Sequence, residues 1–259
     1  QRIFVGNKAN YWVLNYAQGA RNEFNGLVRG LVVLKPQGPI ADPLQLIRSF
    51  PFTRFFNQGE KEVAPVNMQN AEMLEKMDGT MVGVFFPHGD PSKPEFHTRK
   101  LVSSHPEDFK KILTTFTGVK VPFLPKIKQF VDTLIFTQQD VNYTYVFEFI
   151  HEVSKVVSKY APEQYGLYLL GARNLETHRE LSEDELDKTA LRLRAKRPRR
   201  FDAVADKEDI EKMFDVAAAN VPDFEGFIFR DKTTGHRMKV KDPRYVEKHH
   251  KLDNSYTTL

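Results

Sequence analysis

A lysine followed by an Asp-Gly pair is the sharpest chemical signal in this chain of 259 residues. Lys76, Asp78 and Gly79 lie between a segment of helical character (67–74) and a strand-like run that begins at residue 80. Gly79 lets the backbone turn tightly and approach a ligand closely. The spacing therefore places an amine, which is a nucleophile once it has lost its proton, at the tip of a turn. Asp-Gly pairs are also common in surface turns without a function, and the motif alone leaves both interpretations open.

Two lysines near the C-terminal end indicate an anion. Lys239 and Lys241 alternate with Met238 and Val240, so on a strand both ammonium groups point to the same face. Like charges this close repel each other unless an anion lies between them, and the oxygens of a polyphosphate would serve. A solvated edge strand would also tolerate the pair.

Two glutamates stand in otherwise apolar, strand-like runs. Glu148 lies in Phe-Glu-Phe-Ile, and Glu225 opens Glu-Gly-Phe-Ile. A buried carboxylate is costly without a partner. Ribose hydroxyls, a hydrated metal ion or a basic residue could each be that partner, and a structural salt bridge is the simpler alternative for either glutamate.

The charge is mildly basic overall but concentrated in one place. Lys and Arg outnumber Asp and Glu by 38 to 34, a net charge of +4. Within residues 192–200 six of nine side chains are basic, which suits a phosphate backbone, although a solvated helix end would look the same. The six are Arg192, Arg194, Lys196, Arg197, Arg199 and Arg200.

The elements that must position these residues are short strands and a few helices. Runs rich in Val, Phe, Tyr and Ile predict strands at 27–34, 80–86, 95–102, 144–150, 166–170, 226–230 and 236–240. Apolar periodicity and capping residues predict helices at 67–74, 106–116, 124–137, 183–195 and 207–219. There is no internal repeat and no long linker. We therefore expect a single α+β domain over residues 1–259, built on antiparallel sheets flanked by helices.

Composition excludes several classes of protein. The chain has no cysteine, which excludes disulfide scaffolds, thiolate zinc sites and cysteine nucleophiles. No run approaches the ~18 apolar residues of a membrane span, and the first residues lack the order of a signal peptide. We expect an intracellular protein, cytoplasmic or nuclear, without a membrane partner.

Taken in order, the motifs resemble those of the lysine-adenylating nucleotidyltransferases. Lys-x-Asp-Gly, Phe-Glu-Phe-Ile, Glu-Gly-Phe-Ile and Lys-Val-Lys follow one another as in ATP-dependent ligases and capping enzymes. Further segments resemble RNA ligases of the tRNA-repair kind, namely the phage RNA ligase and the adenylyltransferase domain of fungal tRNA ligase. These segments are 28–30, 54–60, 154–160, 169–174 and 241–250. The resemblance runs from about residue 29 to residue 250.

The resemblance implies a ligase-type nucleotidyltransferase fold with the ATP pocket between the antiparallel sheets. It implies an ATP-dependent RNA ligase in which Lys76 attacks the α-phosphorus of ATP and becomes a lysyl–AMP. The AMP would pass to an RNA 5′-phosphate, and a 3′-hydroxyl would displace it to seal the strand. The expected substrate is cleaved tRNA, in tRNA splicing or repair.

The resemblance also implies roles for individual residues. It assigns catalysis to Lys76, Glu225, Lys239 and Lys241, and ATP binding to Arg29, Arg54, Asp78, Gly79, Phe147, Glu148 and Phe149. Glu148 would bind the ribose and Phe147 or Phe149 would line the adenine pocket. Mg²⁺ or Mn²⁺ would be held at Glu225 through water.

Two further assignments by resemblance, and one from the charge run, remain open. Tyr245 is expected near the metal shell or as a packing aromatic. The family's Thr/Ser-x-Lys strand aligns in two ways, and either Arg99 or Lys100 would supply its basic residue for ATP. The cluster at 192–200 would bind RNA.

Two other functions compete with RNA ligation. A capping guanylyltransferase or a DNA ligase shares the core motifs but not segments 54–60 and 169–174. A non-catalytic RNA-binding module would share the fold, yet every charged motif residue is present. We expect a monomer that lacks the family's C-terminal domain and could depend on that domain or on an RNA end-healing domain for substrate recognition.

Overall fold

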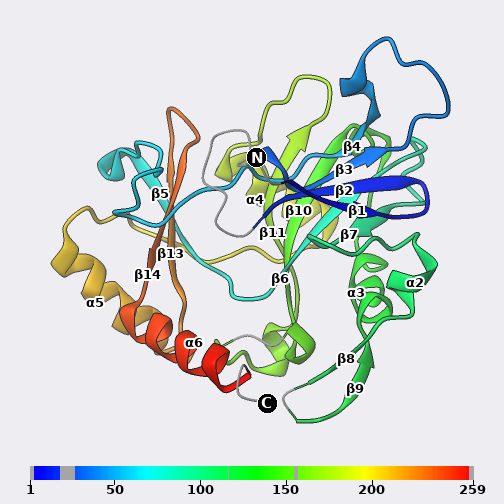
Figure 1. The fold of residues 1–259 in the computed structure, drawn as a ribbon. Helices are drawn as coiled ribbons and strands as arrows, with labels where there is room; N and C mark the ends of the chain where they lie inside the picture. Colours follow the sequence, from blue (N-terminus) through cyan, green and yellow to red (C-terminus); the bar gives the residue numbers. More distant parts are fainter. Residues whose placement is uncertain (1–2, 18–26, 116, 155–156, 257–259) are drawn as a thin grey trace. The chain divides into compact units, whose positions relative to one another are not determined.

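The computed structural model describes residues 3–17, 27–115, 117–154 and 157–256 (Figure 1). Contacts within the chain define two compact units, each made of three segments. Unit 1 comprises Gln1–Arg54, Thr80–Phe149 and Gly166–Arg197, and unit 2 comprises Phe55–Gly79, Ile150–Tyr165 and Pro198–Leu259. Because the segments of the two units alternate along the chain, neither is a contiguous stretch of sequence. The expectation of one domain over the whole chain stays a prediction.

Unit 1 contains two four-stranded sheets and a small hairpin. The first sheet has the order β1 (Ile3–Asn7), β2 (Tyr11–Tyr16), β3 (Arg29–Leu34), β4 (Ile47–Ser49). The second has the order β11 (Gly166–Asn174), β10 (Tyr143–Ile150), β6 (Thr80–Phe85), β7 (Glu95–His97). The hairpin consists of β8 (Ile112–Thr114) and β9 (Lys120–Pro122). Apolar side chains on alternate positions of β2 and β3, with Phe85 and Val102, form one core cluster of this unit.

Unit 1 contains three α-helices in the part of the chain that the structure describes. They are α2 (Pro106–Phe109), α3 (Phe123–Val131) and α4 (Glu183–Leu193). Ser182 and Glu185 form the capping box expected at the start of α4: the Glu185 carboxylate accepts from the Ser182 amide at 2.7 Å, and the Ser182 hydroxyl accepts from the Glu185 amide at 3.3 Å. Leu186, Ala190 and Leu193 form the buried stripe of this helix.

Unit 2 is built on one sheet and two longer helices. The sheet has the order β12 (Arg200–Phe201), β5 (Ala71–Glu75), β13 (Gly226–Asp231), β14 (Arg237–Lys241). The helices are α5 (Lys207–Ala218) and α6 (Pro243–Tyr256). Phe214 of α5 stacks on Phe227 of β13, with ring centroids 5.3 Å apart, and Phe201 and Phe224 pack around the same ring. This aromatic cluster joins the helix to the sheet.

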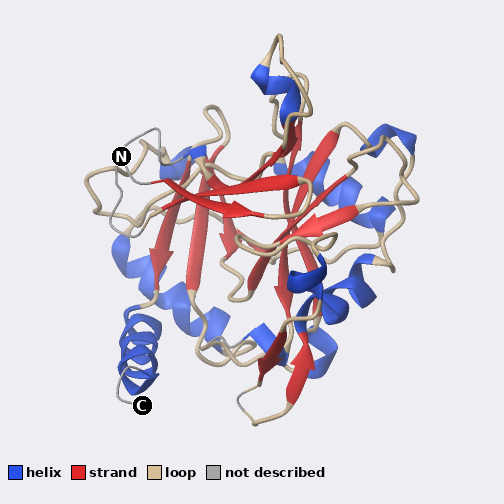
Figure 2. Cartoon of the chain, turned by 45° about the vertical axis from the view of Figure 1, so that its right-hand side comes forward, coloured by secondary structure: helices blue, strands red, loops and turns tan. Residues whose placement is uncertain are grey.

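Short 3-10 helices lie in the connections of both units. They are η1 (Pro43–Leu46), η2 (Met68–Asn70), η3 (Gln138–Asp140), η4 (Glu152–Ser154) and η5 (Pro162–Gln164). Helices and antiparallel strands both contribute to the fold (Figure 2), and the α+β prediction is confirmed. Within the described part of the chain, every helix is too short or too polar to cross a membrane.

Five predicted elements are wrong in type or extent. The strand predicted at 166–170 is longer than expected and continues to Asn174 as β11. The segment 67–74 is not a helix, because Ala71–Glu75 forms strand β5, which pairs with β12 and β13. The helices predicted at 106–116 and 124–137 end early, at Phe109 and Val131. The strand predicted at 95–102 ends at His97, because the Thr98 hydroxyl accepts from the Lys100 and Leu101 amides and turns the chain.

Candidate active site

Lys76 lies directly after the end of a central strand of the unit 2 sheet. Strand β5 pairs with β13 up to the pair Glu75–Phe227. The backbone amide of Lys76 then donates to the Gly226 carbonyl at 2.8 Å, and the amide of Glu75 donates to the Arg199 carbonyl at 2.9 Å. The backbone that carries the lysine is therefore held by hydrogen bonds to the chain on either side of it, at Gly226 and at Arg199.

One carboxylate joins two of the predicted lysines. Lys76 Nζ lies 2.7 Å from Glu225 Oε2, and Lys241 Nζ lies 3.0 Å from Glu225 Oε1. The Glu225 side chain is 4% exposed, whereas the lysines are 21% and 31% exposed. Burial by itself would raise the pKa of Glu225, but the charges of Lys76 and Lys241 outweigh it and hold the pKa below its usual value. The glutamate is thus a charged bridge that aligns two amines.

Asp78 anchors the turn that follows Lys76. Its Oδ2 accepts from the amides of Val157 and Ser158, each at 3.0 Å, and its own amide donates to the Tyr160 hydroxyl at 2.9 Å. Burial and the neighbouring charge of Glu225 raise the pKa of the Asp78 carboxyl. These contacts hold the Asp-Gly turn to segment 157–160.

Two tyrosine hydroxyls meet at this turn. Tyr245 of α6 is 4% exposed, and its hydroxyl hydrogen-bonds to the Asp78 side chain. Burial, with the charges of Glu225 and Asp78, raises its pKa. Sequence reasoning missed Tyr160, although it lies in the segment 154–160 that resembles the RNA ligases. Lys155 and Val156 of that segment lie outside the described residues.

Lys239 and Lys241 point to one face of β14, as the alternation predicts. Met238 and Val240, which alternate with the two lysines, are buried. The Lys239 amide donates to the Phe56 carbonyl at 3.0 Å, and the Gln58 amide donates to the Lys239 carbonyl at 2.8 Å. Lys239 Nζ lies 5.6 Å from the centre of the Phe55 ring. Residues 55–58, within the segment 54–60 that resembles the RNA ligases, therefore lie along the lysine-bearing strand.

Unit 1 places two arginines against the Tyr16 ring and a third, Arg29, close enough to Arg99 for their charges to interact. The guanidinium carbons of Arg54 and Arg99 lie 4.5 and 5.1 Å from the centre of the Tyr16 ring. Burial and the charge of Arg29 lower the pKa of Arg99, and its Nε is buried without a hydrogen-bond partner. Such a convergence of cations suits an anion. Lys100 is exposed, and the observed grouping favours Arg99 as the basic residue of this cluster; sequence reasoning missed Tyr16.

Glu148 and its two phenylalanine neighbours occupy opposite faces of β10. Phe147 and Phe149 are fully buried, and Phe149 packs edge-on against Phe130 with centroids 5.3 Å apart. Glu148 is partly exposed on the other face and pairs in register with Met81. The roles at ribose and adenine stay predictions.

Four of the six cations in the cluster 192–200 form ion pairs. The contacts are Arg192 with Asp140 at 2.7 Å, Arg197 with Asp187 at 2.7 Å and with Glu183, Arg199 with Glu75 at 2.8 Å, and Arg200 with Glu72 at 2.9 Å. Arg194 ends α4 in the left-handed conformation, and Lys196 lies 5.6 Å from the centre of the Tyr168 ring. The contacts show that these cations brace their units. Binding of RNA by this cluster stays a prediction.

The carboxylates fit a hydrated divalent cation better than a fully protein-bound one. Among the described residues no group of three His, Asp or Glu side chains could hold a metal ion. Mg²⁺ usually keeps several waters and binds one or two carboxylates together with substrate phosphates. Glu225 is shared by two lysines and Asp78 by two amides, so these oxygens suit contact through water.

Comparisons with known proteins agree with this geometry. The sequence matches the RNA ligase family over residues 27–245, whereas no curated protein matches it. Two forms of an archaeal ATP-dependent RNA ligase share the fold with TM-scores of 0.59 at 15% identity. The matches cover 93% and 94% of this chain but 58% and 59% of those chains, so this chain spans less than two thirds of their length. The ligase-type fold prediction is confirmed.

Proposed function

Since the chain belongs to the RNA ligase family, we propose that it joins RNA strands with ATP through a lysyl–AMP intermediate. The observation that carries the proposal is the buried Glu225 carboxylate that bridges Lys76 and Lys241. It holds the Lys76 amine beside Lys241, a cation on the same face as Lys239 that can neutralise charge on a phosphate under attack.

The first step of the proposed reaction uses the three lysines. The lone pair of Lys76 Nζ forms a bond to the α-phosphorus of ATP, while the bond from that phosphorus to the bridging oxygen breaks. Pyrophosphate leaves with the electron pair. The Lys76 ammonium loses one proton to solvent before the attack and a second one after it, so that one N–H stays on the nitrogen bonded to phosphorus. Lys239 and Lys241 stabilise the charge that develops on the α-phosphate oxygens, and Glu225 orients Lys76.

The later steps transfer and then release AMP. An oxygen of an RNA 5′-phosphate attacks the adenylyl phosphorus, and the phosphorus–nitrogen bond to Lys76 breaks as the amine takes up a proton. The oxygen of an RNA 3′-hydroxyl then attacks the 5′-phosphorus, loses its proton and displaces AMP. Lys239 and Lys241 face the phosphate in each step.

The remaining groups bind ATP and metal in this proposal. Arg29, Arg54 and Arg99 bind the β- and γ-phosphates, since Arg54 and Arg99 lie against the Tyr16 ring and the charges of Arg29 and Arg54 act on Arg99. Glu148 binds the ribose. Mg²⁺ or Mn²⁺ held near Glu225 through water would screen the polyphosphate charge.

The finer parts of the proposal concern the RNA substrate and the location of the protein in the cell. Cleaved tRNA is proposed as the substrate because segments 54–60 and 169–174 resemble the tRNA-repair ligases. An intracellular location, cytoplasmic or nuclear, stays a prediction from composition, as does the monomeric state.

Sealing of RNA tests the function. The chain is incubated with Mg²⁺, a 5′-phosphorylated RNA and an RNA with a 3′-hydroxyl end, with ATP or GTP. We expect joined product with ATP, none with GTP and none for Lys76→Ala, whereas Lys120→Ala, at an exposed position of β9, seals normally. Transfer of GMP from GTP to the chain, without joined RNA, would favour a capping-type enzyme, and binding of RNA without any nucleotide transfer would favour a non-catalytic module.

A further inference from the structure

The last two residues of strand β2, Asn15 and Tyr16, lie where the arginines of unit 1 gather. The Tyr16 amide donates to the Val28 carbonyl at 2.8 Å, directly before Arg29. The register of β2 against β3 shifts between Leu14 and Asn15, so that Asn15 lies opposite Arg29. An irregularity of this kind bends a strand and changes the direction of its side chains. The end of β2 is therefore shaped differently from the regular sheet before it.

Asn15 holds the backbone of Arg99. Asn15 is 3% exposed, and its Nδ2 donates to the Arg99 carbonyl. The Thr98 hydroxyl accepts from the amides of Lys100 and Leu101 at 3.2 and 3.1 Å. The turn that carries Arg99 is thus held by side chains from β2 and from the turn itself, and the long arginine side chain keeps most of the remaining freedom.

The Tyr16 ring is the place where this side chain meets a second arginine. The guanidinium carbons of Arg54 and Arg99 lie 4.5 and 5.1 Å from the ring centre, within the ~6 Å at which an aromatic ring attracts a cation. Burial and the charges of Arg29 and Arg54 lower the pKa of Arg99, as expected of cations that repel one another. One ring therefore attracts two like charges and offsets part of their repulsion.

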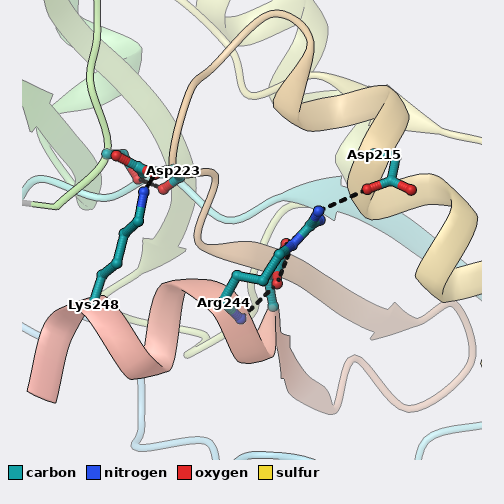
Figure 3. A network of polar contacts seen from close by, with 6 residues as sticks. Asp215, Asp223, Arg244 and Lys248 are labelled. Carbon is teal, nitrogen blue, oxygen red and sulfur yellow. Dashed lines mark hydrogen bonds and ion pairs between the residues drawn. The ribbon is translucent and has the colours of Figure 1, made fainter.

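An arginine that braces the fold has different surroundings in this chain. Arg244 of α6 lies 2.7 Å from Asp242 and 2.8 Å from Asp215 (Figure 3), and its hydrogen bonds to these carboxylates raise its pKa. The charges that lower the pKa of Arg99 belong to two other arginines, and its Nε is buried without a hydrogen-bond partner. A group of cations held by a ring in this way suits a ligand with several negative charges.

We propose that Tyr16 is a positioning residue whose ring gathers Arg54 and Arg99 before ATP binds, and that it thereby makes the site prefer a triphosphate to a monophosphate. Without the ring the two guanidinium groups repel each other and separate. A smaller fraction of the chain then presents both groups to the β- and γ-phosphates, and the apparent affinity for ATP falls with that fraction. AMP lacks these phosphates and gains nothing from the ring. The inference rests on the ATP site of the proposed function and adds a residue that selects the ligand.

Calorimetric titration with two ligands tests the inference. The chain, first shown to be free of bound AMP, is titrated in Mg²⁺ with AMP and with α,β-methylene-ATP, an analogue that cannot transfer its adenylyl group. We expect Tyr16→Leu to bind the analogue about tenfold more weakly, the loss expected of two partly exposed cation–π contacts, and to bind AMP as the unmodified chain does. Tyr16→Phe keeps the ring and should bind both ligands nearly normally.

Tyr168→Leu is the matched control. Tyr168 is also partly exposed, and Lys196 Nζ lies 5.6 Å from the centre of its ring. Its strand β11 is at the edge of the sheet opposite to β7, the strand that precedes Arg99. Tyr168→Leu should bind both ligands as the unmodified chain does.

The kinetics of lysyl–AMP formation give a second readout that a loss of folding would not produce. Tyr16→Leu should raise the KM for ATP about tenfold and leave the rate at saturating ATP nearly unchanged. A partly unfolded variant would instead lose rate at every ATP concentration. Circular dichroism checks the fold, and Tyr16→Met carries the same test should the leucine variant not fold.

Four results would overturn the inference. The unmodified chain could bind the analogue no more tightly than AMP, or Tyr16→Leu could bind the analogue normally. Tyr16→Leu could also lose affinity for both ligands equally, which would indicate a structural role. Tyr16→Phe could bind the analogue as weakly as Tyr16→Leu, which would assign the effect to the hydroxyl group and not to the ring.

The same assays separate this inference from the proposed function. Normal lysyl–AMP formation with an unchanged KM in Tyr16→Leu would refute the inference and leave the ligase proposal standing. A Tyr16-dependent preference for the triphosphate in a chain that never forms lysyl–AMP would support the inference and refute the ligase proposal.

Discussion

Gly226 is the position at which one added methyl group should disturb both the fold and the proposed chemistry. Its φ is +145°, a conformation that side chains rarely adopt. A Cβ at this position would lie 2.2 Å from the Val240 carbonyl oxygen and 2.7 Å from the Lys241 Cα. Both contacts are with backbone, so no side chain can rotate away. Gly226→Ala must therefore push β13 and β14 apart at the pair that carries Glu225 next to Lys241.

The loss of stability expected for Gly226→Ala has two causes, backbone strain and overpacking. The disfavoured backbone conformation costs roughly 1–3 kcal/mol, and forcing atoms into packed structure costs about 1–3 kcal/mol more. We expect Gly226→Ala to lower the free energy of unfolding by about 2–6 kcal/mol. Because the Gly226 carbonyl also accepts from the Lys76 amide, lysyl–AMP formation should slow about a hundredfold, as misplacement by 1 Å can do.

Gly235→Ala is the matched control, because Gly235 lies in the turn between β13 and β14, has a φ of +72° and has no atom within 4 Å of an added Cβ. It isolates backbone strain, about 1–2 kcal/mol, from the clash. Urea unfolding gives the stability of both variants, and the rate of AMP incorporation gives the activity. Equal losses of stability for the two variants, or a Gly226→Ala chain that forms lysyl–AMP at the normal rate, would refute the reasoning.

Three other residues give sharp predictions. Burial lowers the pKa of His97 from its ordinary 6.5 to about 4, so the unfolded chain binds a proton that the folded chain rejects between these values. The free energy of unfolding should therefore keep its full value above pH 6.5 and fall by about 3 kcal/mol as the pH drops to 4. Urea unfolding across this range should show a smaller fall for His97→Gln. Tyr160→Phe removes the acceptor of the Asp78 amide and should cost about 1 kcal/mol of stability while slowing AMP incorporation; an unchanged rate would show that this anchor does not position Lys76. Arg99→Ala should raise the ATP concentration for half-maximal lysyl–AMP formation at least about tenfold, whereas Lys100→Ala, at an exposed position, should leave it nearly unchanged; the reverse order would assign the site to Lys100.

Local patterns predicted those parts of the fold that depend on neighbours in sequence. The capping box of Ser182 and Glu185 marks the start of α4 as expected, and the alternation of Lys239 and Lys241 places both lysines on one face of β14. The prediction for segment 71–75 was wrong because this strand is formed by pairing with β12 and β13. These partners are distant in sequence, and the residues of the segment itself do not indicate them. Helix α6 was missed because its sequence is polar and lacks a clear apolar stripe.

In the candidate site too, local motifs could be recognised in the sequence, whereas contacts between distant residues could not. The Lys76 motif was visible in the sequence, but the contact between Lys76 and Glu225 joins residues far apart in the chain. Only the resemblance to a family linked them. The basic run at 192–200 had a strong local signal, and yet four of its cations pair with carboxylates elsewhere in the chain. A run of charged residues can be recognised in the sequence, but the carboxylates with which its members pair are determined by the fold.

The central claim is that Lys76 is the nucleophile held by Glu225. The most direct test is the intact mass of the chain, first shown to be free of bound AMP, after incubation with ATP and Mg²⁺, followed by peptide mapping of the adduct. The account predicts the addition of one adenylyl group on Lys76, absent with GTP and absent in Lys76→Ala. An adduct on another residue, or no adduct with ATP, would contradict it.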